Sequence, residues 1–115
     1  MNWSHYYLYT RAHVKILSPS SPGIYRLQIR NRIFYIGQCR NIRRRLIEHL
    51  GGRNTNHLVI RYLQKYRCFF RFAKLESAED LLTAEREQIR KYKPPCNMDI
   101  RTIEENARAP KQLRS

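Results

Sequence analysis

The chain has 115 residues and carries 23 lysines and arginines against 9 acidic residues, which gives a formal net charge of +14. That length supports one domain, and hydrophobic residues make up 42% of the chain, enough for a core, which excludes a wholly disordered basic tail. The sequence has neither the roughly 18 consecutive apolar residues of a membrane span nor a secretory signal at its start, so we expect an intracellular protein, cytoplasmic or nucleoid-associated.

Residues 1–22 are expected to form an N-terminal extension. Within it, residues 6–9 and 14–17 are candidates for short extended pieces. Serines and prolines at 18–22 then break any regular structure.

A β-hairpin is expected next. Apolar and polar side chains alternate over residues 24–29, which is typical of a strand with one buried face. A turn at 30–32 contains an asparagine, which tolerates positive φ. Residues 33–36 follow as a strand that is apolar on both faces, which favours a central place in the sheet. Gly37 marks a bulge or a close approach of the backbone to another group.

Three helices and one more strand complete the expected elements. Asn41 is a good N-cap for a helix that ends at Gly51-Gly52, and the apolar spacing over 58–66 predicts a second helix. Residues 68–73 predict a strand. Ser77, with an aspartate three residues on, opens a helix that runs to about residue 92.

The order of hairpin, helix, helix, strand and helix predicts one α/β domain of the α+β type, with a small mixed or antiparallel sheet. This domain is expected to span residues 23–97. Residues 98–115 contain few large apolar side chains and are expected to form a basic, frayed C-terminal tail.

The surplus of positive charge makes polyanions the expected partners, with nucleic acid ahead of an acidic protein or an acidic membrane surface. Lysines and arginines are interleaved with apolar positions, which indicates folded elements with a basic face. Arginine outnumbers lysine, which favours forked contacts to phosphate groups.

Several polar side chains lie at positions where the sequence pattern predicts apolar packing residues or side chains without a special role. Glu85 lies inside the apolar stripe of the last helix, so its carboxylate is expected to be paired, metal-bound or at a cleft wall, or else to reach solvent at the helix edge. Arg45 and His49 are four apart and share a helix face, where the alternative is a solvated histidine on a basic helix. Tyr25 and Tyr35 lie on adjacent strands, where tyrosine is ordinarily packing material. The stripe around Glu85 consists of Ala78, Leu81, Leu82, Ile89 and Tyr92.

Together these side chains supply one acid, one forked cation, one histidine and two phenols, which are parts that phosphodiester hydrolysis needs. A carboxylate can hold a hard cation that stabilises charge on the phosphate, and an arginine can support the pentacoordinate transition state. A further group must orient and deprotonate a water molecule. The single acid on a packing face favours one metal ion over a two-metal site.

Four segments, in order, resemble the GIY-YIG nuclease family. Gly23-Ile24-Tyr25 and Tyr35-Ile36-Gly37 match the paired signature of that family at its usual hairpin spacing. Residues 41–46, Asn-Ile-Arg-Arg-Arg-Leu, resemble its Asn-Leu-x-x-Arg-Leu helix start. The resemblance covers residues 23–97, and the last matching positions are Glu85, Ile89, Pro94 and Asn97.

The resemblance implies a small three-stranded antiparallel sheet flanked by helices, and a DNA endonuclease that uses one divalent metal ion, Mg²⁺ or Mn²⁺. It implies that Tyr25 is the phenol that activates the water, as general base or relay, and that Tyr35 forms a hydrogen bond at the scissile phosphate. It further implies that Arg45 stabilises the developing negative charge and that Glu85 holds the metal ion.

Asn97 is implied to brace the site by side-chain hydrogen bonds. His49 matches a histidine of some members, including homing and restriction enzymes, that assists proton transfer or orients a tyrosine.

DNA is the implied partner and a membrane is not. A monomer is consistent with the sequence, and the oligomeric state stays open. The side chains expected to contact DNA are Arg40, Arg43, Arg44 and Lys65.

The chain has 22 residues before the signature and 18 after Asn97, less than the recognition domains or further modules of homing, restriction and excision-repair members. We therefore expect cutting that is structure-selective or of low sequence specificity. The alternatives are a non-catalytic basic nucleic-acid-binding module with the same fold and an adaptor whose charge targets an acidic partner. On the helix at 58–66, aromatic side chains are expected in the core in preference to a DNA-contacting face.

Overall fold

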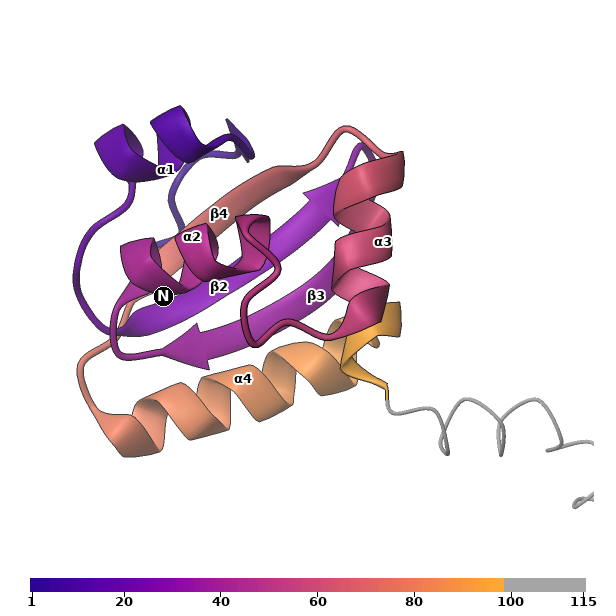
Figure 1. Cartoon of the computed structure of the whole chain (residues 1–115). Coiled ribbons are helices and arrows are strands. Elements are labelled where there is room, and N and C mark those ends of the chain that lie inside the picture. Colours follow the sequence, from indigo (N-terminus) through magenta and orange to yellow (C-terminus); the bar gives the residue numbers. More distant parts are fainter. Residues whose placement is uncertain (99–115) are drawn as a thin grey trace, which may run out of the picture.

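The computed structural model describes residues 1–98, which form a four-stranded sheet with helices on both faces (Figure 1). The expected C-terminal tail lies outside the described residues, apart from residue 98. No helix within residues 1–98 combines the length and the apolar character that crossing a membrane requires. The strands are β1 (Tyr7–Leu8), β2 (Gly23–Ile29), β3 (Arg32–Cys39) and β4 (Phe69–Lys74), and the helices are α1 (Arg11–Leu17), α2 (Ile42–Leu50), α3 (His57–Lys65), α4 (Ala78–Tyr92) and the 3₁₀ helix η1 (Pro95–Asn97).

The sheet has the strand order β1-β4-β2-β3, and all neighbouring strands are antiparallel. The hairpin expected from the alternating pattern is confirmed as β2 and β3. The prediction of three strands is wrong, because Tyr7 and Leu8 of the N-terminal segment pair with Phe70 and Phe69 of β4 and add a fourth. A strand of two residues is too short to show an alternating pattern, so the sequence reveals only the extended character of residues 6–9.

β3 lies at the edge of the sheet, so the prediction that it is central is wrong. The strand is apolar on both faces because both faces of the sheet are covered even at this edge. Phe34 belongs to the core cluster shared with α2 and α3, whereas Ile36 belongs to the cluster shared with α4. The register of the hairpin shifts between Leu27 and Gln28, so the bulge lies near the turn and not at Gly37.

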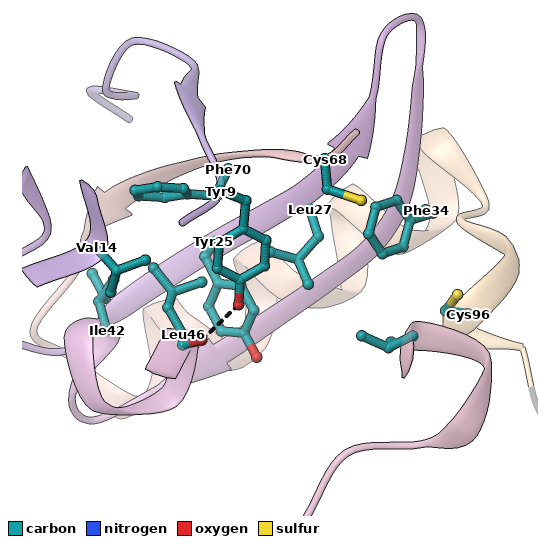
Figure 2. Packing of buried hydrophobic residues seen from close by; sticks show 11 residues of the cluster. Tyr9, Val14, Tyr25, Leu27, Phe34, Ile42, Leu46, Cys68, Phe70 and Cys96 are labelled. Carbon is teal, nitrogen blue, oxygen red and sulfur yellow. Dashed lines mark hydrogen bonds between the residues drawn. The ribbon is translucent and has the colours of Figure 1, made fainter. Parts of the chain in front are cut away.

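Two core clusters lie on opposite faces of the sheet. The larger one packs Tyr25 of β2 against Ile42 and Leu46 of α2 (Figure 2). There the hydroxyl of Tyr9 donates a 2.7 Å hydrogen bond to the carbonyl oxygen of Leu46, which ties the N-terminal segment to α2 (Figure 2). The smaller cluster lies beneath α4 and contains Ile24, Ile36, Ala73 and Ala84. Packing therefore holds the hairpin from both sides.

Each of the four α-helices begins after a residue whose side chain caps its N-terminus. Asn41, Asn56 and Ser77 accept hydrogen bonds from backbone N–H groups in the first turns of α2, α3 and α4, and the three expected helices are confirmed. The prediction of an extended piece at 14–17 is wrong, because Thr10 caps the seven-residue helix α1. Val14 is the one buried residue of α1, so this helix has no apolar stripe for a sequence pattern to show.

Candidate active site

The two signature tyrosines lie side by side on the face of the hairpin that packs against α2. Tyr25 pairs with Gly37 across β2 and β3, and the ring centroids of Tyr25 and Tyr35 are 6.2 Å apart. The Tyr25 hydroxyl passes so close to Gly37 that a Cβ atom at this position would clash with the hydroxyl oxygen. The close approach expected at Gly37 is therefore confirmed, and a larger residue there would displace the phenol.

A chain of hydrogen bonds runs from Tyr25 through His49 to the loop after α2. The Tyr25 hydroxyl oxygen lies 2.7 Å from His49 Nε2, and His49 Nδ1 lies 3.0 Å from the hydroxyl oxygen of Thr55. The Thr55 hydroxyl donates its own proton to the carbonyl oxygen of Arg53 at 2.8 Å, so it must accept from His49. The proton of the neutral imidazole is therefore on Nδ1, and Nε2 accepts from the Tyr25 hydroxyl.

Burial keeps both partners of this hydrogen bond uncharged at neutral pH. His49 is 1% exposed, and burial, followed by the positive charge of Arg45, lowers its pKa to about 3. Burial, followed by the neighbouring Tyr35 phenol, raises the pKa of Tyr25 well above its ordinary value, while Arg45 acts in the opposite direction. The alternative of a solvated histidine is thus wrong, and the buried neutral imidazole accepts a hydrogen bond from Tyr25.

The low pKa of His49 predicts that the protein loses stability in acid. Between about pH 6.5 and pH 3 the unfolded chain protonates this histidine whereas the folded protein does not, so the free energy of unfolding falls by up to about 1.4 kcal/mol per pH unit. Denaturant unfolding between pH 7 and pH 4.5 should show a weaker pH dependence for His49→Gln than for the wild type. His57 is exposed, so His57→Gln should keep the wild-type slope, and identical slopes in all three proteins would contradict the prediction.

Arg45 lies one helical turn before His49 and is held by the loop that follows α2. Its guanidinium forms the one ion pair found within residues 1–98, 3.1 Å from Glu48, and it donates at 2.7 Å to the carbonyl oxygen of Asn54. Burial raises the pKa of Tyr35, and the nearby charge of Arg45 is the strongest effect that opposes this rise. A forked cation therefore stands next to the phenols.

Glu85 lies in the middle of α4, the helix that packs along β3. Its carboxyl group is half-buried, and burial raises its pKa, while the backbone of Gln38 and the charge of Arg86 lower it. The carboxyl group is thus partly withdrawn from solvent, and the charge of Arg86 lies nearby. The predicted stripe of α4 is wrong for three of its members, because the helix packs on the sheet through a narrower face than the pattern suggests; the exposed members are Ala78, Leu82 and Tyr92.

Asn97 is bound to the outer edge of β3. Its side-chain nitrogen donates to the carbonyl oxygen of Ile36 at 2.7 Å, and its side-chain oxygen accepts from the N–H of Ile36 at 2.8 Å. The amide thereby pairs both backbone groups that an edge strand otherwise presents to solvent at this residue. The middle residue of Tyr35-Ile36-Gly37 is held in place as a result.

The one carboxylate assigned to the metal, that of Glu85, suits a hard divalent cation better than zinc. Within residues 1–98, no three His, Cys, Asp or Glu side chains gather closely enough to form a metal site of their own. Zinc needs three or four such ligands, whereas Mg²⁺ keeps several waters and binds through one or two carboxylates together with substrate phosphates. The half-buried carboxylate of Glu85 therefore fits a hard divalent cation.

The four side chains expected to contact DNA are placed differently. Arg40 and Arg44 are exposed near the start of α2, and Lys65 is exposed at the end of α3. Arg43 is half-buried and donates two hydrogen bonds, 2.9 and 2.6 Å long, to the carbonyl oxygen of Ser18. Three of them thus lie at the surface, while Arg43 joins α2 to the N-terminal segment.

The aromatic side chains of α3 and its C-cap divide between core and surface. The ring of Tyr62 stacks on that of Phe34 with the centroids 4.5 Å apart. Tyr66 is 42% exposed and its ring centroid lies 5.5 Å from the Lys65 ammonium. The prediction of core packing is confirmed for Tyr62 and wrong for Tyr66.

Thr55 is the member of this site that sequence reasoning misses. It follows the Gly51-Gly52 helix end, and no helical or strand spacing relates it to His49. The one local signal is its place directly before Asn56, the N-cap of α3. Its contact with His49 depends on how the whole loop folds back, which a spacing pattern does not show.

Comparison with known proteins agrees with the signature residues. The family model described as UvrC-like GIY-YIG domain matches residues 21–98. UvrABC system protein C of Ruegeria sp. is 32% identical over 92 residues, and that of Bacteroides fragilis is 35% identical over 86 residues. These matches cover 79% and 70% of this chain but 14% and 13% of the relatives. The chain therefore corresponds to a small part of their length.

A solved structure has the same fold. It is the crystal structure of the GIY-YIG N-terminal endonuclease domain of UvrC from Thermotoga maritima, bound to magnesium as its catalytic divalent cation. The TM-score is 0.64 at 23% sequence identity, and the match covers 76% of this chain and 94% of the other. The expected α+β fold class is thus confirmed.

Proposed function

The chain belongs to the UvrC-like GIY-YIG family, and we propose that it is a divalent-metal-dependent endonuclease that hydrolyses phosphodiester bonds of DNA. The observation that carries this proposal is the hydrogen bond from the Tyr25 hydroxyl to a buried, neutral His49 near the Arg45 guanidinium. Packing alone does not require a phenol whose proton is directed at an imidazole held in one tautomer. The net charge of +14 supports a polyanionic substrate.

In the proposed reaction, the Tyr25–His49 pair accepts the proton of the attacking water. The Tyr25 oxygen takes this proton as its own passes to His49 Nε2, so neither a free phenolate nor a free hydroxide has to form. Burial and the charge of Arg45 disfavour a positively charged His49, so the transfer is proposed to depend on the negative charge that the substrate phosphate brings to the site. Thr55 keeps the ring in position throughout, because it accepts from Nδ1 before and after the transfer.

The other side chains are proposed to act on the phosphate. Tyr35 donates a hydrogen bond at the scissile phosphate, and Arg45 stabilises the charge that develops on its oxygens. Glu85 would hold a single Mg²⁺ or Mn²⁺ ion, which when bound supplies Lewis-acid stabilisation of the phosphate and of the leaving oxygen. Asn97 braces this arrangement through Ile36.

Three exposed basic side chains on or next to α2 and α3 are proposed to contact the DNA backbone. Such contacts carry no sequence information, so we expect cutting to be structure-selective or of low sequence specificity. Residues 23–97 are proposed as the catalytic unit, with 1–22 as an extension and 98–115 as a basic tail. The proposed backbone contacts are Arg40, Arg44 and Lys65, whereas the guanidinium of Arg43 is bound to the carbonyl oxygen of Ser18.

Nicking of supercoiled plasmid DNA tests the proposal. We expect cutting in Mg²⁺ or Mn²⁺ and none in EDTA, and labelled linear, flapped and branched duplexes will show which DNA structure is preferred. Salt-sensitive DNA binding without cutting in either metal would overturn the nuclease proposal. It would favour the second candidate, a non-catalytic nucleic-acid-binding module with the same fold.

A further inference from the structure

A concave surface lies at the turn end of the β2–β3 hairpin, and none of the roles proposed above involves it. A hollow of about 410 Å³ opens there between the N-terminal segment, the turn that joins β2 to β3, and the end of α4. Its lining includes Tyr6, Gln28, Arg30, Arg32 and Tyr92.

The chemistry of this hollow suits one nucleotide. Tyr6 and Tyr92 are 46% and 39% exposed as residues, and their rings line the hollow as aromatic surfaces on which a base can stack. Arg30 and Arg32 are exposed and offer forked donors to phosphate oxygens. No carboxylate is among the lining residues that the structure describes, so an anion meets no repulsion from the wall.

Two arginines fix the aromatic walls of the hollow. Arg26 and Arg71 are cross-strand neighbours on β2 and β4. The guanidinium of Arg26 lies 4.8 Å from the ring centroid of Tyr92, and that of Arg71 lies 4.0 Å from the ring centroid of Tyr6. Trp3 covers Arg26 at 4.0 Å. Each tyrosine ring is therefore held by at least one cation, and the ammonium of Lys91 lies a further 5.2 Å from the ring centroid of Tyr92. Rings that are already ordered lower the cost of stacking a base on them.

The hollow also lies within reach of the candidate active site. Glu85 and Tyr92 are both on α4 and are seven residues apart, so they lie on one side of the helix, about 10 Å apart along its axis. Three nucleotide steps of a DNA strand cover the same distance where the bases stay stacked as in a duplex, at about 3.4 Å per step. A strand that passes Glu85 along the helix thus reaches the hollow.

We propose that this hollow binds an unpaired nucleotide of the DNA substrate, about three nucleotides from the bond that is cut. The base stacks on Tyr6 and Tyr92, and the flanking phosphates contact Arg30 and Arg32. A base inside a duplex must leave its partner before it can stack on a protein ring, so the hollow selects DNA with an unpaired strand beside the cut site. This inference rests on the proposed nuclease function and specifies the DNA structure that the enzyme prefers.

DNA binding without cleavage tests the inference. Fluorescence anisotropy in EDTA compares a fully paired duplex with the same duplex carrying an unpaired tail of about six nucleotides. We expect the wild type to bind the tailed DNA more tightly. Tyr6→Leu and, independently, Arg32→Ala should each weaken binding of the tailed DNA about tenfold, the size of one lost base stack or phosphate contact, and binding of the paired duplex less than twofold.

Matched variants separate stacking from general charge effects. Tyr6→Phe keeps the ring and should keep the preference for tailed DNA. Arg11 is exposed on α1, so Arg11→Ala removes one positive charge elsewhere and should affect both DNAs equally. Arg32 is exposed in the hairpin, so its variant reports on the hollow even if Tyr6→Leu proves unstable.

Two results would overturn the inference: equal losses on both DNAs in Tyr6→Leu and Arg32→Ala, or no loss on the tailed DNA in either variant. Absence of plasmid cutting in Mg²⁺ contradicts the nuclease proposal alone, because the preference for tailed DNA is measured without metal.

Discussion

Glu85→Gln should lower the rate of DNA cleavage about a thousandfold or more, because Lewis-acid stabilisation by a bound cation contributes several kcal/mol to the transition state. Glutamine keeps the size of the side chain and its half-buried place near the backbone of Gln38. It removes the negative charge that a hard cation requires. We therefore expect a lower rate of the chemical step and an unchanged free energy of unfolding.

Single-turnover nicking at several Mg²⁺ concentrations measures this effect, and anisotropy in EDTA measures DNA binding separately. Binding should be unchanged or slightly tighter, since one negative charge is removed from a surface that meets phosphates. Glu87 is exposed on the same helix, so Glu87→Gln is the matched control and should cut at the wild-type rate. Cleavage by Glu85→Gln within tenfold of the wild type would show that the metal ion is held elsewhere.

Tyr25→Phe should slow cleavage about 10²- to 10⁴-fold, the range that a positioned general base or acid contributes. The phenyl ring still fills its place in the core cluster. The hydroxyl that donates to His49 Nε2 is lost, which leaves a buried acceptor without its partner and costs about 1 kcal/mol of stability. Single-turnover cleavage and denaturant unfolding of the same preparation measure the two effects.

Tyr9 offers a matched control for this substitution. It is also a buried tyrosine, and its hydroxyl donates to the carbonyl oxygen of Leu46 outside the candidate site. Tyr9→Phe should lose a similar amount of stability with little change in cleavage. Thr55→Val removes the acceptor that fixes the imidazole tautomer, so its cleavage rate should lie between those of Tyr25→Phe and Tyr9→Phe. Thr55→Ser keeps the hydroxyl and should cleave at the wild-type rate. Equal cleavage by Tyr25→Phe and Tyr9→Phe would assign Tyr25 to packing.

The parts of the fold that follow from the sequence are those with a strong local pattern. β2 shows alternation, and α2, α3 and α4 each have a capping side chain followed by apolar residues at helical spacing. The sheet order does not follow, because pairing of β4 with β2 and of β1 with β4 joins residues far apart in the sequence. β1 and α1 are too short to show a periodic pattern.

The candidate site also contains some residues whose positions follow from a local sequence pattern and others whose positions do not. Arg45 and His49 share one helix face, and Tyr25 and Tyr35 share one face of the hairpin, so their proximity follows from helical and strand periods. Thr55 does not, because a loop brings it to His49. Arg26 shows a further limit of pattern reading. It occupies a polar position of an alternating strand yet is 6% exposed, because aromatic rings and Gln88, which accepts from its Nε at 3.1 Å, replace solvent around the guanidinium.

The place of β1 in the sheet sets the order in which the domain completes itself during synthesis. Tyr7 pairs with Phe70, so β1 leaves the ribosome well before β4 and has no partner until β4 has followed it. Pairing over such a separation in sequence is slow compared with formation of the local hairpin. The aromatic N-terminal residues of the nascent chain thus stay accessible to chaperones until translation has passed β4, and only then does the sheet close.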